Sequence, residues 1–160
     1  MMSKKVNKTN AIRFLDSKKI NYDLFEYEIE DGLIDGESVC AKLNVAANES
    51  LKTLVAKGKG NSFFVFVVAI DRELDLKKAA KISGEKKIEM LAVKDLLDVT
   101  GYIRGGCSPI GMKKHYATFI DESVKDLAKV YVSGGRKGIS IGIDPKVLKD
   151  ITLSEFGDLT

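Results

Sequence analysis

The chain has 160 residues, which is enough for one domain with a sizeable hydrophobic core and too few for two ordinary domains with a linker. Hydrophobic residues make up 44% of it and charged residues 31%, a balance typical of globular proteins that excludes extensive disorder. The net charge of +3 helps a polyanion to approach but is far below that of a dedicated nucleic-acid-binding protein. We therefore expect a single domain over residues 1–160.

Membrane, secretory and metal-binding signals are missing from the sequence. No apolar run approaches the roughly 20 residues that cross a bilayer, and the charged beginning of the chain lacks the apolar stretch of a secretory signal. We therefore expect a cytoplasmic protein with no membrane partner. Cys40 and Cys107 form no CxxC pair and have only His115 as an imidazole partner, so we expect neither a zinc site nor another cofactor.

Regular patterns of helix and strand run through the chain. The strongest is a hairpin in which two apolar runs flank the turn residues 57–61. Thr9 and the pair Asp144 and Pro145 are typical of helix beginnings. The expected elements are helix 10–19, strand 22–29, helix 37–44, strands 51–55 and 62–70, helices 74–81 and 92–98, strands 116–120, 129–133 and 138–143, and a final helix from 145. Strands outnumber strict strand–helix–strand alternations, which favours a mixed α/β fold with a curved mixed sheet or partial barrel surrounded by short helices.

Residues 100–111 contain four glycines and a proline. Because glycine has no Cβ, a ligand can approach main-chain N–H groups closely, and such a loop can hold a carbonyl oxygen or a carboxylate. The loop contains no GxxxxGK[ST] motif and is therefore not a P-loop. A plain glycine-rich connection between two elements explains the same composition, so composition alone leaves both interpretations open.

Residues 100–102, 105–111 and 113–114 resemble the central signature of the YbaK/EbsC family, which contains Cys-tRNA(Pro) deacylases. The resemblance extends almost end to end, through residues 9–11 with Arg13, 51–54, 74–78, 86–87 with 89–90, and 132–135 with Gly138. It implies the YbaK/prolyl-tRNA synthetase-associated domain fold. It also implies a trans-acting enzyme that removes mischarged cysteine from tRNA(Pro), with aminoacylated tRNA and a prolyl-tRNA synthetase complex as partners.

The resemblance also implies a set of site residues. Lys52 matches the family's functional lysine, and residues 105–109 match a GxxxP motif that shapes the editing pocket. The implied catalytic groups are the Lys52 ammonium, which positions the ester or the tRNA terminus, and the N–H groups of Gly105 and Gly106. The two N–H groups stabilise the oxyanion. The implied substrate-binding residues are Tyr27, Cys107, Ser108, Pro109, Ser133 and Gly134. Without the resemblance, Lys52 is explained as a solvated lysine on the outer face of a strand, and Tyr27, Ser133 and Gly134 as core or turn residues.

The sequence lacks the usual parts of a hydrolase with its own nucleophile. It has one histidine and neither an HExxH nor a GxSxG motif. The route proposed for the family is that the substrate cysteine's thiol attacks its own ester carbonyl and forms a thiolactone, which requires only that the substrate be held correctly. In relatives of the family, an Asp commonly follows the SGG turn at the position of Ser140. The carboxylate that would contact the substrate's amino group is therefore missing, and the amino-acid specificity stays open.

Two alternatives remain at this point. In the first, the enzyme is a deacylase of different amino-acid specificity in which Cys107 is the nucleophile and His115 activates it. In the second, the protein is an RNA-binding regulatory module whose basic surface is formed by Arg104, Lys113, Lys114, Arg136 and Lys137.

Overall fold

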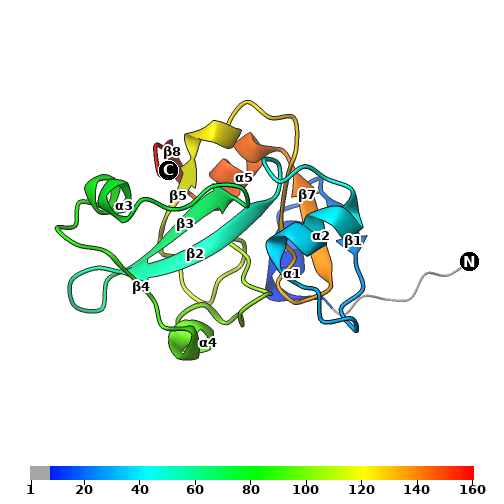
Figure 1. Cartoon of the computed structure of the whole chain (residues 1–160), viewed down its shortest axis with the longest axis horizontal. Coiled ribbons are helices and arrows are strands. Elements are labelled where there is room, and N and C mark those ends of the chain that lie inside the picture. Colours follow the sequence, from blue (N-terminus) through cyan, green and yellow to red (C-terminus); the bar gives the residue numbers. More distant parts are fainter. Residues whose placement is uncertain (1–7) are drawn as a thin grey trace, which may run out of the picture.

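The computed structural model describes residues 8–160, and its strands form two sheets (Figure 1). The three-stranded sheet has the order β1-β7-β6 and is antiparallel, whereas the five-stranded sheet has the order β4-β2-β3-β5-β8 and mixes antiparallel with parallel pairs. The strands are β1 (Asp23–Glu26), β2 (Leu51–Lys57), β3 (Phe63–Ala69), β4 (Glu89–Met90), β5 (Ala117–Asp121), β6 (Val130–Ser133), β7 (Ile139–Ile143) and β8 (Glu155–Gly157). The expected mixed α/β class is confirmed.

Short helices surround the sheets, and side-chain caps set where most of them begin. The Thr9 hydroxyl accepts a hydrogen bond from the Ile12 N–H, and Asp35, Asp75 and Asp144 cap later helices in the same way. The helices are α1 (Asn10–Ser17), α2 (Gly36–Leu43), α3 (Leu76–Ser83), α4 (Leu96–Thr100) and α5 (Pro145–Ile151), with single 3-10 turns η1 (Val93–Asp95) and η2 (Glu122–Val124). Within residues 8–160, none of the helices has the length and apolar character needed to cross a membrane.

The observed elements follow the predicted order with three differences. The predicted strand 22–29 is paired only over β1, because the chain then leaves the sheet in a loop. The sequence patterns missed β4 and β8, which are two and three residues long and therefore too short to show a periodic signal.

Two hydrophobic clusters occupy the two faces of the five-stranded sheet. Along β2, Leu51 and Val55 belong to the larger cluster, which lies between the two sheets, whereas Ala56 belongs to a smaller cluster with the α3 residues Ala79 and Ala80. This alternation follows from the two-residue period of a strand. The hairpin of β2 and β3 is therefore buried on both faces and forms a rigid support.

The two sheets meet just before β2. Ser50 forms a parallel bridge with Tyr131 of β6, and the Tyr131 N–H donates a 2.9 Å hydrogen bond to the Glu49 carbonyl. Figure 1 shows the β2–β3 hairpin extending from this junction toward α3 and β4 at the other end of the molecule. The first residues of β2 consequently lie beside the three-stranded sheet, and its last residues lie far from it.

Candidate active site

A pocket of about 190 Å³ lies at the junction of the two sheets. Its walls come from the starts of β2 and β7, from β6, from α2 and the loop before it, and from the glycine-rich loop after α4. The side chains and main chain that line it belong to Tyr27, Ile34, Gly36, Val39, Ser50, Leu51, Lys52, Thr53, Ile70, Gly105, Cys107, Tyr131, Val132, Ser133, Ile139 and Ser140. Of the sequence-predicted site residues, the structure thus brings together Tyr27, Lys52, Gly105, Cys107 and Ser133.

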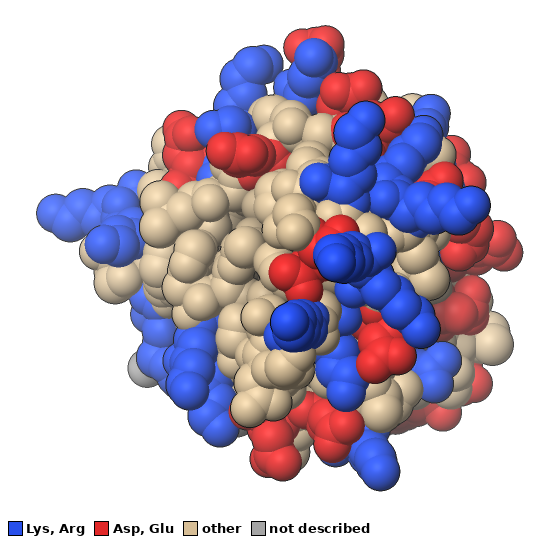
Figure 2. All heavy atoms as spheres, turned by 90° about the vertical axis from the view of Figure 1, so that its left-hand side faces the viewer, with Lys and Arg blue, Asp and Glu red and all other residues tan. Residues whose placement is uncertain are grey.

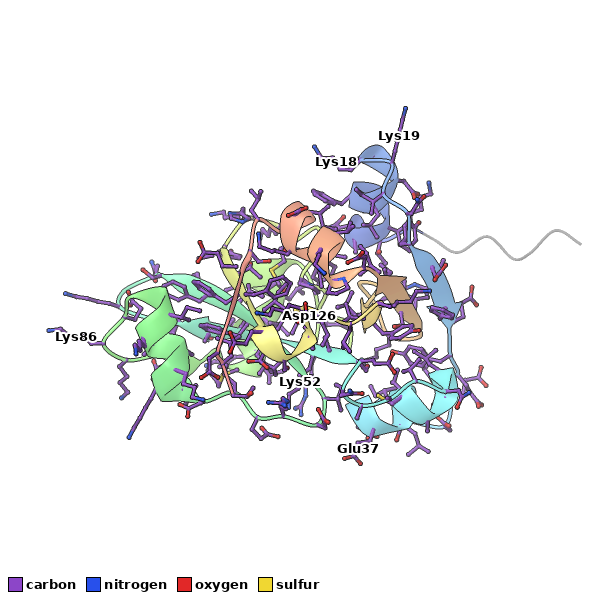
Figure 3. The ribbon with its side chains drawn as sticks, turned by 90° about the horizontal axis from the view of Figure 1, so that it is seen from above. Lys18, Lys19, Glu37, Lys52, Lys86 and Asp126 are labelled. Atoms are coloured by element: carbon purple, nitrogen blue, oxygen red, sulfur yellow. The ribbon has the colours of Figure 1, made fainter. Side chains whose placement is uncertain are left out.

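Among the described residues that line this pocket, Lys52 is the only charged one. It is the second residue of β2, opposite Val68 on β3, and it lies near the middle of the molecule in the view from above (Figure 3). Its Nζ lies 3.5 Å from Oε1 of Glu73, whose side chain is 94% exposed, so this ion pair is weak and easily exchanged for another anion. The ammonium is partly shielded and is available to a ligand at the pocket.

Gly105 and Gly106 are required by different features of the loop. Gly105 has a φ of +84°, which side-chain-bearing residues rarely adopt. Gly106 lies against the next loop, because a Cβ added there would be 2.7 Å from Cα of Arg136. The two glycines therefore hold the loop tightly against the turn between β6 and β7, which brings Arg136 and Lys137 beside the pocket.

The two glycine N–H groups are not equivalent. The Gly106 N–H donates a 2.9 Å hydrogen bond to the Ile103 carbonyl, and Gly106 does not line the pocket. Its predicted role as an oxyanion donor is therefore not available in this conformation, because the turn uses the donor. The Gly105 N–H has no acceptor among residues 8–160, and Gly105 does line the pocket.

Three further predicted substrate-binding residues do not line the pocket. Ser108 is fully buried and its hydroxyl accepts from the Ile110 N–H at 3.2 Å, whereas Pro109 lines a different cavity. The Gly134 N–H donates to the Ile139 carbonyl at 3.0 Å, which closes the β6–β7 turn. These residues belong to the two loops that form the pocket but do not line it in this conformation.

Thr53 is a pocket residue that the sequence reasoning missed. Its Oγ1 is buried and has no hydrogen-bond partner among the described residues, the only such side-chain atom found there. A buried hydroxyl without a partner is costly unless a ligand or water satisfies it. With Ser50, Ser133 and Ser140 it makes four serine and threonine residues among those that line the pocket. The position of Thr53 next to Lys52 was visible in the sequence, but its lack of a partner was not.

A loop closed by Lys42 forms another wall of the pocket. Tyr27 and Ile34 line the pocket at the two ends of this loop. Between them, the Lys42 ammonium donates to the Glu28 carbonyl at 2.6 Å and to the Leu33 carbonyl and Asp31 Oδ1 at 2.8 Å each. The hydrogen bond from Lys42 is the main cause that lowers the pKa of the Asp31 carboxyl. Lys42 on α2 thus fixes the distance between the two lining residues.

Comparisons with known proteins identify the family. A family model described as an aminoacyl-tRNA editing domain matches residues 34–151. The chain belongs to this aminoacyl-tRNA editing family. A protein of Enterococcus faecalis (strain ATCC 700802 / V583) named "Putative Cys-tRNA(Pro)/Cys-tRNA(Cys) deacylase EbsC" is 41% identical over 153 residues, covering 96% of this chain and 93% of that protein. These findings confirm the resemblance to the YbaK/EbsC family and the enzymatic class, an aminoacyl-tRNA deacylase.

Other similarities extend this result. A proline–tRNA ligase of Brachyspira hyodysenteriae is 26% identical over 115 residues, which are 72% of this chain and 20% of the ligase. A crystal structure described as "a putative trans-editing enzyme for prolyl tRNA synthetase" superposes with a TM-score of 0.86 at 20% identity, covering 94% of both chains. At this identity the superposition shows the fold, and it is the fold that the resemblance implied.

The editing domain gives no support to Cys107 as a nucleophile. Burial, only partly offset by a hydrogen bond with Thr100, raises the pKa of the Cys107 thiol to about 11, so the thiol stays protonated near neutral pH. His115 does not line the pocket; its Nε2 lies 3.2 Å from the Thr152 carbonyl in the cavity that contains Pro109. The pair needed for thiol activation is therefore not assembled.

The proposed single basic surface is also divided. Arg136 and Lys137 lie against the two glycines beside the pocket. Lys113, in contrast, donates a 3.1 Å hydrogen bond to the Asp98 carbonyl, and Lys114 lines the cavity of His115. No observation favours a purely regulatory RNA-binding role over an editing enzyme.

Proposed function

We propose that this chain is a trans-acting deacylase that removes cysteine from mischarged Cys-tRNA(Pro). The observation that carries the proposal is that Lys52 and the Gly105 turn line one small pocket whose other walls are uncharged. The volume of about 190 Å³ corresponds to roughly six water molecules in the liquid. A pocket of this volume is large enough for a small aminoacyl group.

The proposed reaction uses the substrate's own thiol. The sulfur attacks the carbonyl carbon of the ester, a C–S bond forms, and the C–O bond to the terminal ribose breaks. The proton lost by the thiol is taken up by the departing ribose oxygen, which leaves a four-membered thiolactone and free tRNA. Water then opens the thiolactone to cysteine. Intramolecular attack of this kind gains its rate from orientation, with effective molarities on the order of 10⁵ M or more when the geometry is held.

The residues of the pocket have distinct roles in this proposal. The Gly105 N–H donates to the oxyanion, and the Lys52 ammonium holds the ester or the ribose and offsets the developing negative charge. Tyr27 and Ser133 form the walls around the amino acid, and Thr53 contributes a buried hydroxyl that has no partner among residues 8–160. The Gly106 N–H is assigned no role, because Ile103 already accepts its hydrogen bond.

Ser140 influences how the substrate's amino group is bound. Its hydroxyl donates to the Val132 carbonyl at 3.2 Å, and no carboxylate is found among the described residues that line the pocket. A substrate ammonium would therefore meet hydroxyl and carbonyl oxygens and the repulsion of Lys52. Discrimination then depends on the fit of the side chain and on the reactivity of its thiol.

The proposal that the protein acts on tRNA(Pro), together with a prolyl-tRNA synthetase, is supported by two similarities. The similar E. faecalis protein carries Cys-tRNA(Pro) in its name, and nearly its whole length matches this chain. Part of several proline–tRNA ligases matches this chain as well. Both similarities favour a substrate charged by that synthetase.

The test is deacylation of Cys-, Ala-, Ser- and Pro-tRNA(Pro) by the purified protein, with products identified by mass spectrometry. We expect Cys-tRNA(Pro) to be cleared fastest, with the thiolactone as the first product, and Ser-tRNA(Pro) to be slow because a hydroxyl is a weaker nucleophile than a thiol. Equal rates for Cys and Ser would exclude thiol assistance. Absence of deacylation for all four substrates would overturn the proposed activity.

A further inference from the structure

A second hollow lies at the opposite end of β2 and is rich in lysine. A groove of about 460 Å³ is lined by the β2–β3 turn and by the loop that follows α3. Its lining residues are Lys57, Gly58, Lys59, Gly84, Glu85, Lys86, Lys87 and Glu89, four of which are lysines. We call it the lysine groove. Figure 2 looks onto this end of the molecule, where lysine and arginine side chains project outward with acidic side chains between them.

Glu85 ties the two sides of the lysine groove together. Its Oε1 accepts a 2.6 Å hydrogen bond from the Lys59 N–H and occupies the space of a Cβ on Gly58, only 2.0 Å from that position. The carboxylate therefore lies where a side chain at 58 would be and joins the loop after α3 to the hairpin turn. The groove is held in shape by this contact, and the carboxylate is used inside the protein.

Most of the ammonium groups of the lysine groove have no acidic partner. Lys57 lies 3.7 Å from Glu89, a distance at which an exposed pair contributes little. Lys59, Lys86 and Lys87 form no salt bridge with any residue of the described chain. Three unpaired positive charges thus surround an open hollow, and Lys86 projects from the end of the molecule in Figure 3.

Neighbouring lysines on α3 enlarge this positive region. Residues 77–87 contain five lysines and one glutamate, whereas the whole chain has a net charge of only +3. Lys77 and Lys81 are exposed one helical turn apart. Such a concentration of positive charge on one end of a nearly neutral protein is typical of a surface that binds a polyanion.

The geometry of β2 relates the lysine groove to the pocket. Lys52 lines the pocket and Lys57 lines the groove. The five residue steps between their Cα atoms span about 17 Å at about 3.4 Å per residue. A polynucleotide whose acylated end occupies the pocket has phosphates within this reach. The extended β2 strand is rigid, so the two sites keep a fixed separation.

We propose that the lysine groove binds the phosphate backbone of the tRNA whose aminoacylated end occupies the pocket. This inference rests on the proposed function for the identity of the RNA. The groove contributes affinity and orientation along the RNA, with Lys59, Lys86 and Lys87 as the contacting residues, and it does not touch the amino acid. Phosphate contacts of this kind fix register without reading base sequence.

The first experiment measures binding without catalysis. Fluorescence polarisation with labelled, uncharged tRNA compares the wild-type chain with a Lys59→Gln/Lys86→Gln/Lys87→Gln variant. The matched control is Lys18→Gln/Lys19→Gln/Lys125→Gln, which removes the same charge from exposed positions elsewhere; Figure 3 shows Lys18 and Lys19 far from Lys86. Thermal unfolding of all three proteins confirms that each is folded.

The groove variant and the control variant should differ clearly in their affinity for tRNA. We expect the groove variant to raise the Kd for tRNA roughly tenfold or more and to reduce the slope of log K against log salt by about 2, because each lost phosphate contact removes about 0.7 to 0.9 from that slope. The control should stay within about twofold of wild type, because its lysines lie outside the groove and salt screens their effect on a distant phosphate. Equal affinities of the groove and control variants would overturn the proposal. Binding of labelled polyglutamate is measured in the same way. If the groove variant binds tRNA as tightly as the control variant but no longer binds polyglutamate, the proposal is overturned and the groove is assigned to an acidic protein.

The second experiment separates this proposal from the proposed function. Deacylation is measured on full-length Cys-tRNA and on a short cysteinylated oligonucleotide that ends before the groove. The groove variant should raise KM for the full-length substrate about tenfold, with no change for the short one. The wild-type chain could fail to deacylate either substrate while the groove variant still binds tRNA more weakly than wild type. That result would support the groove proposal and overturn the proposed deacylase function. An equal rise of KM for both substrates would overturn the groove proposal, because the lysines would then act on the pocket.

Discussion

The two ends of β2 carry two contrasting sites. At the Lys52 end, a small pocket contains one ammonium, several hydroxyl groups and a glycine-rich turn. At the Lys57 end, an open groove contains four lysines around a carboxylate that the protein uses for its own hairpin. The pocket is suited to discriminate by fit and by hydrogen bonds, whereas the groove is suited to attract any phosphate backbone. In our two proposals, the chemistry and the affinity of this editing domain are placed at opposite ends of one strand.

Lys52→Ala is expected to cause the greatest loss of activity. Loss of the ammonium should lower deacylation at least about a hundredfold, on full-length and short substrates alike, because the charge acts in the transition state. The free energy of unfolding should change little, since the lysine forms only a weak pair with Glu73. Single-turnover kinetics and chemical denaturation measure the two quantities.

Glu73→Gln is the matched control for Lys52. It removes the same ion pair but keeps the ammonium, so the deacylation rate should stay within about threefold of wild type. A loss equal to that of Lys52→Ala would mean that the ion pair, and not the free ammonium, matters for the reaction.

Thr53→Val tests whether the substrate uses the unpartnered hydroxyl of the pocket. The substitution keeps the shape and removes the unpartnered hydroxyl, so stability should be unchanged or slightly higher while kcat/KM falls about tenfold. Thr118→Val is the contrasting variant, because the Thr118 hydroxyl donates a 2.8 Å hydrogen bond to the Tyr116 carbonyl outside the pocket. It should lose about 1 kcal/mol of stability and retain activity. An unchanged kcat/KM in Thr53→Val would show that the substrate does not use this hydroxyl.

A smaller effect is expected from Lys42→Met, which releases the loop between Tyr27 and Ile34. KM should rise about threefold to tenfold for both substrates, because the ordering of the loop would then accompany binding. Asp31→Asn, which keeps the two carbonyl acceptors of Lys42, should have the weaker effect. Hydrogen exchange of residues 28–33 reports the release directly, and unchanged exchange in Lys42→Met would contradict the interpretation.

The pH dependence of this loop follows from Asp31. The lowered pKa means that Asp31 is ionised in the folded protein throughout the neutral range. Its contribution is therefore fully present above the ordinary carboxyl value of 3.8 and is lost as the pH falls through the lowered value. Between about pH 5 and pH 9, loop exchange corrected for its intrinsic rate should not change.

The smallest effect is expected from Cys107→Ala, which should retain deacylation within about threefold of wild type, because a protonated thiol is not a nucleophile. The alkylation rate of Cys107, measured in a Cys40→Ala background, should stay low at neutral pH and rise as the pH approaches the thiol pKa of about 11. Because the folded pKa is raised above the usual 9.0, stability is unaffected below pH 9 and falls as the pH rises toward 11. Complete loss of deacylation in a folded Cys107→Ala variant would restore the cysteine nucleophile.

Much of the fold was predictable because local physics determines it. The hairpin of β2 and β3 follows from two apolar runs around a glycine-containing turn, and α3 follows from Asp75 at its beginning and Gly84 at its end. The pairing of β3 with β5, parallel and far apart in sequence, was not predictable, because no local pattern specifies which strands become neighbours. The division into two sheets is likewise a result of tertiary packing.

The candidate site shows the same division. Lys52 and Gly105 were identified from motifs and line the pocket, whereas Ser108, Pro109 and Gly134, which motifs also marked, do not line it. A motif marks residues that a loop needs, but it does not distinguish those that touch the substrate from those that hold the loop.

By itself, the sequence determined the family, the order of the elements and the residues of the loop, because these depend on side-chain type and near neighbours along the chain. Only the tertiary structure decided which donor of the loop is free, which hydroxyl lacks a partner and which lysines remain unpaired. The physical reason is that hydrogen bonds and ion pairs are satisfied between segments distant in sequence, so the availability of a group for a ligand depends on the whole fold.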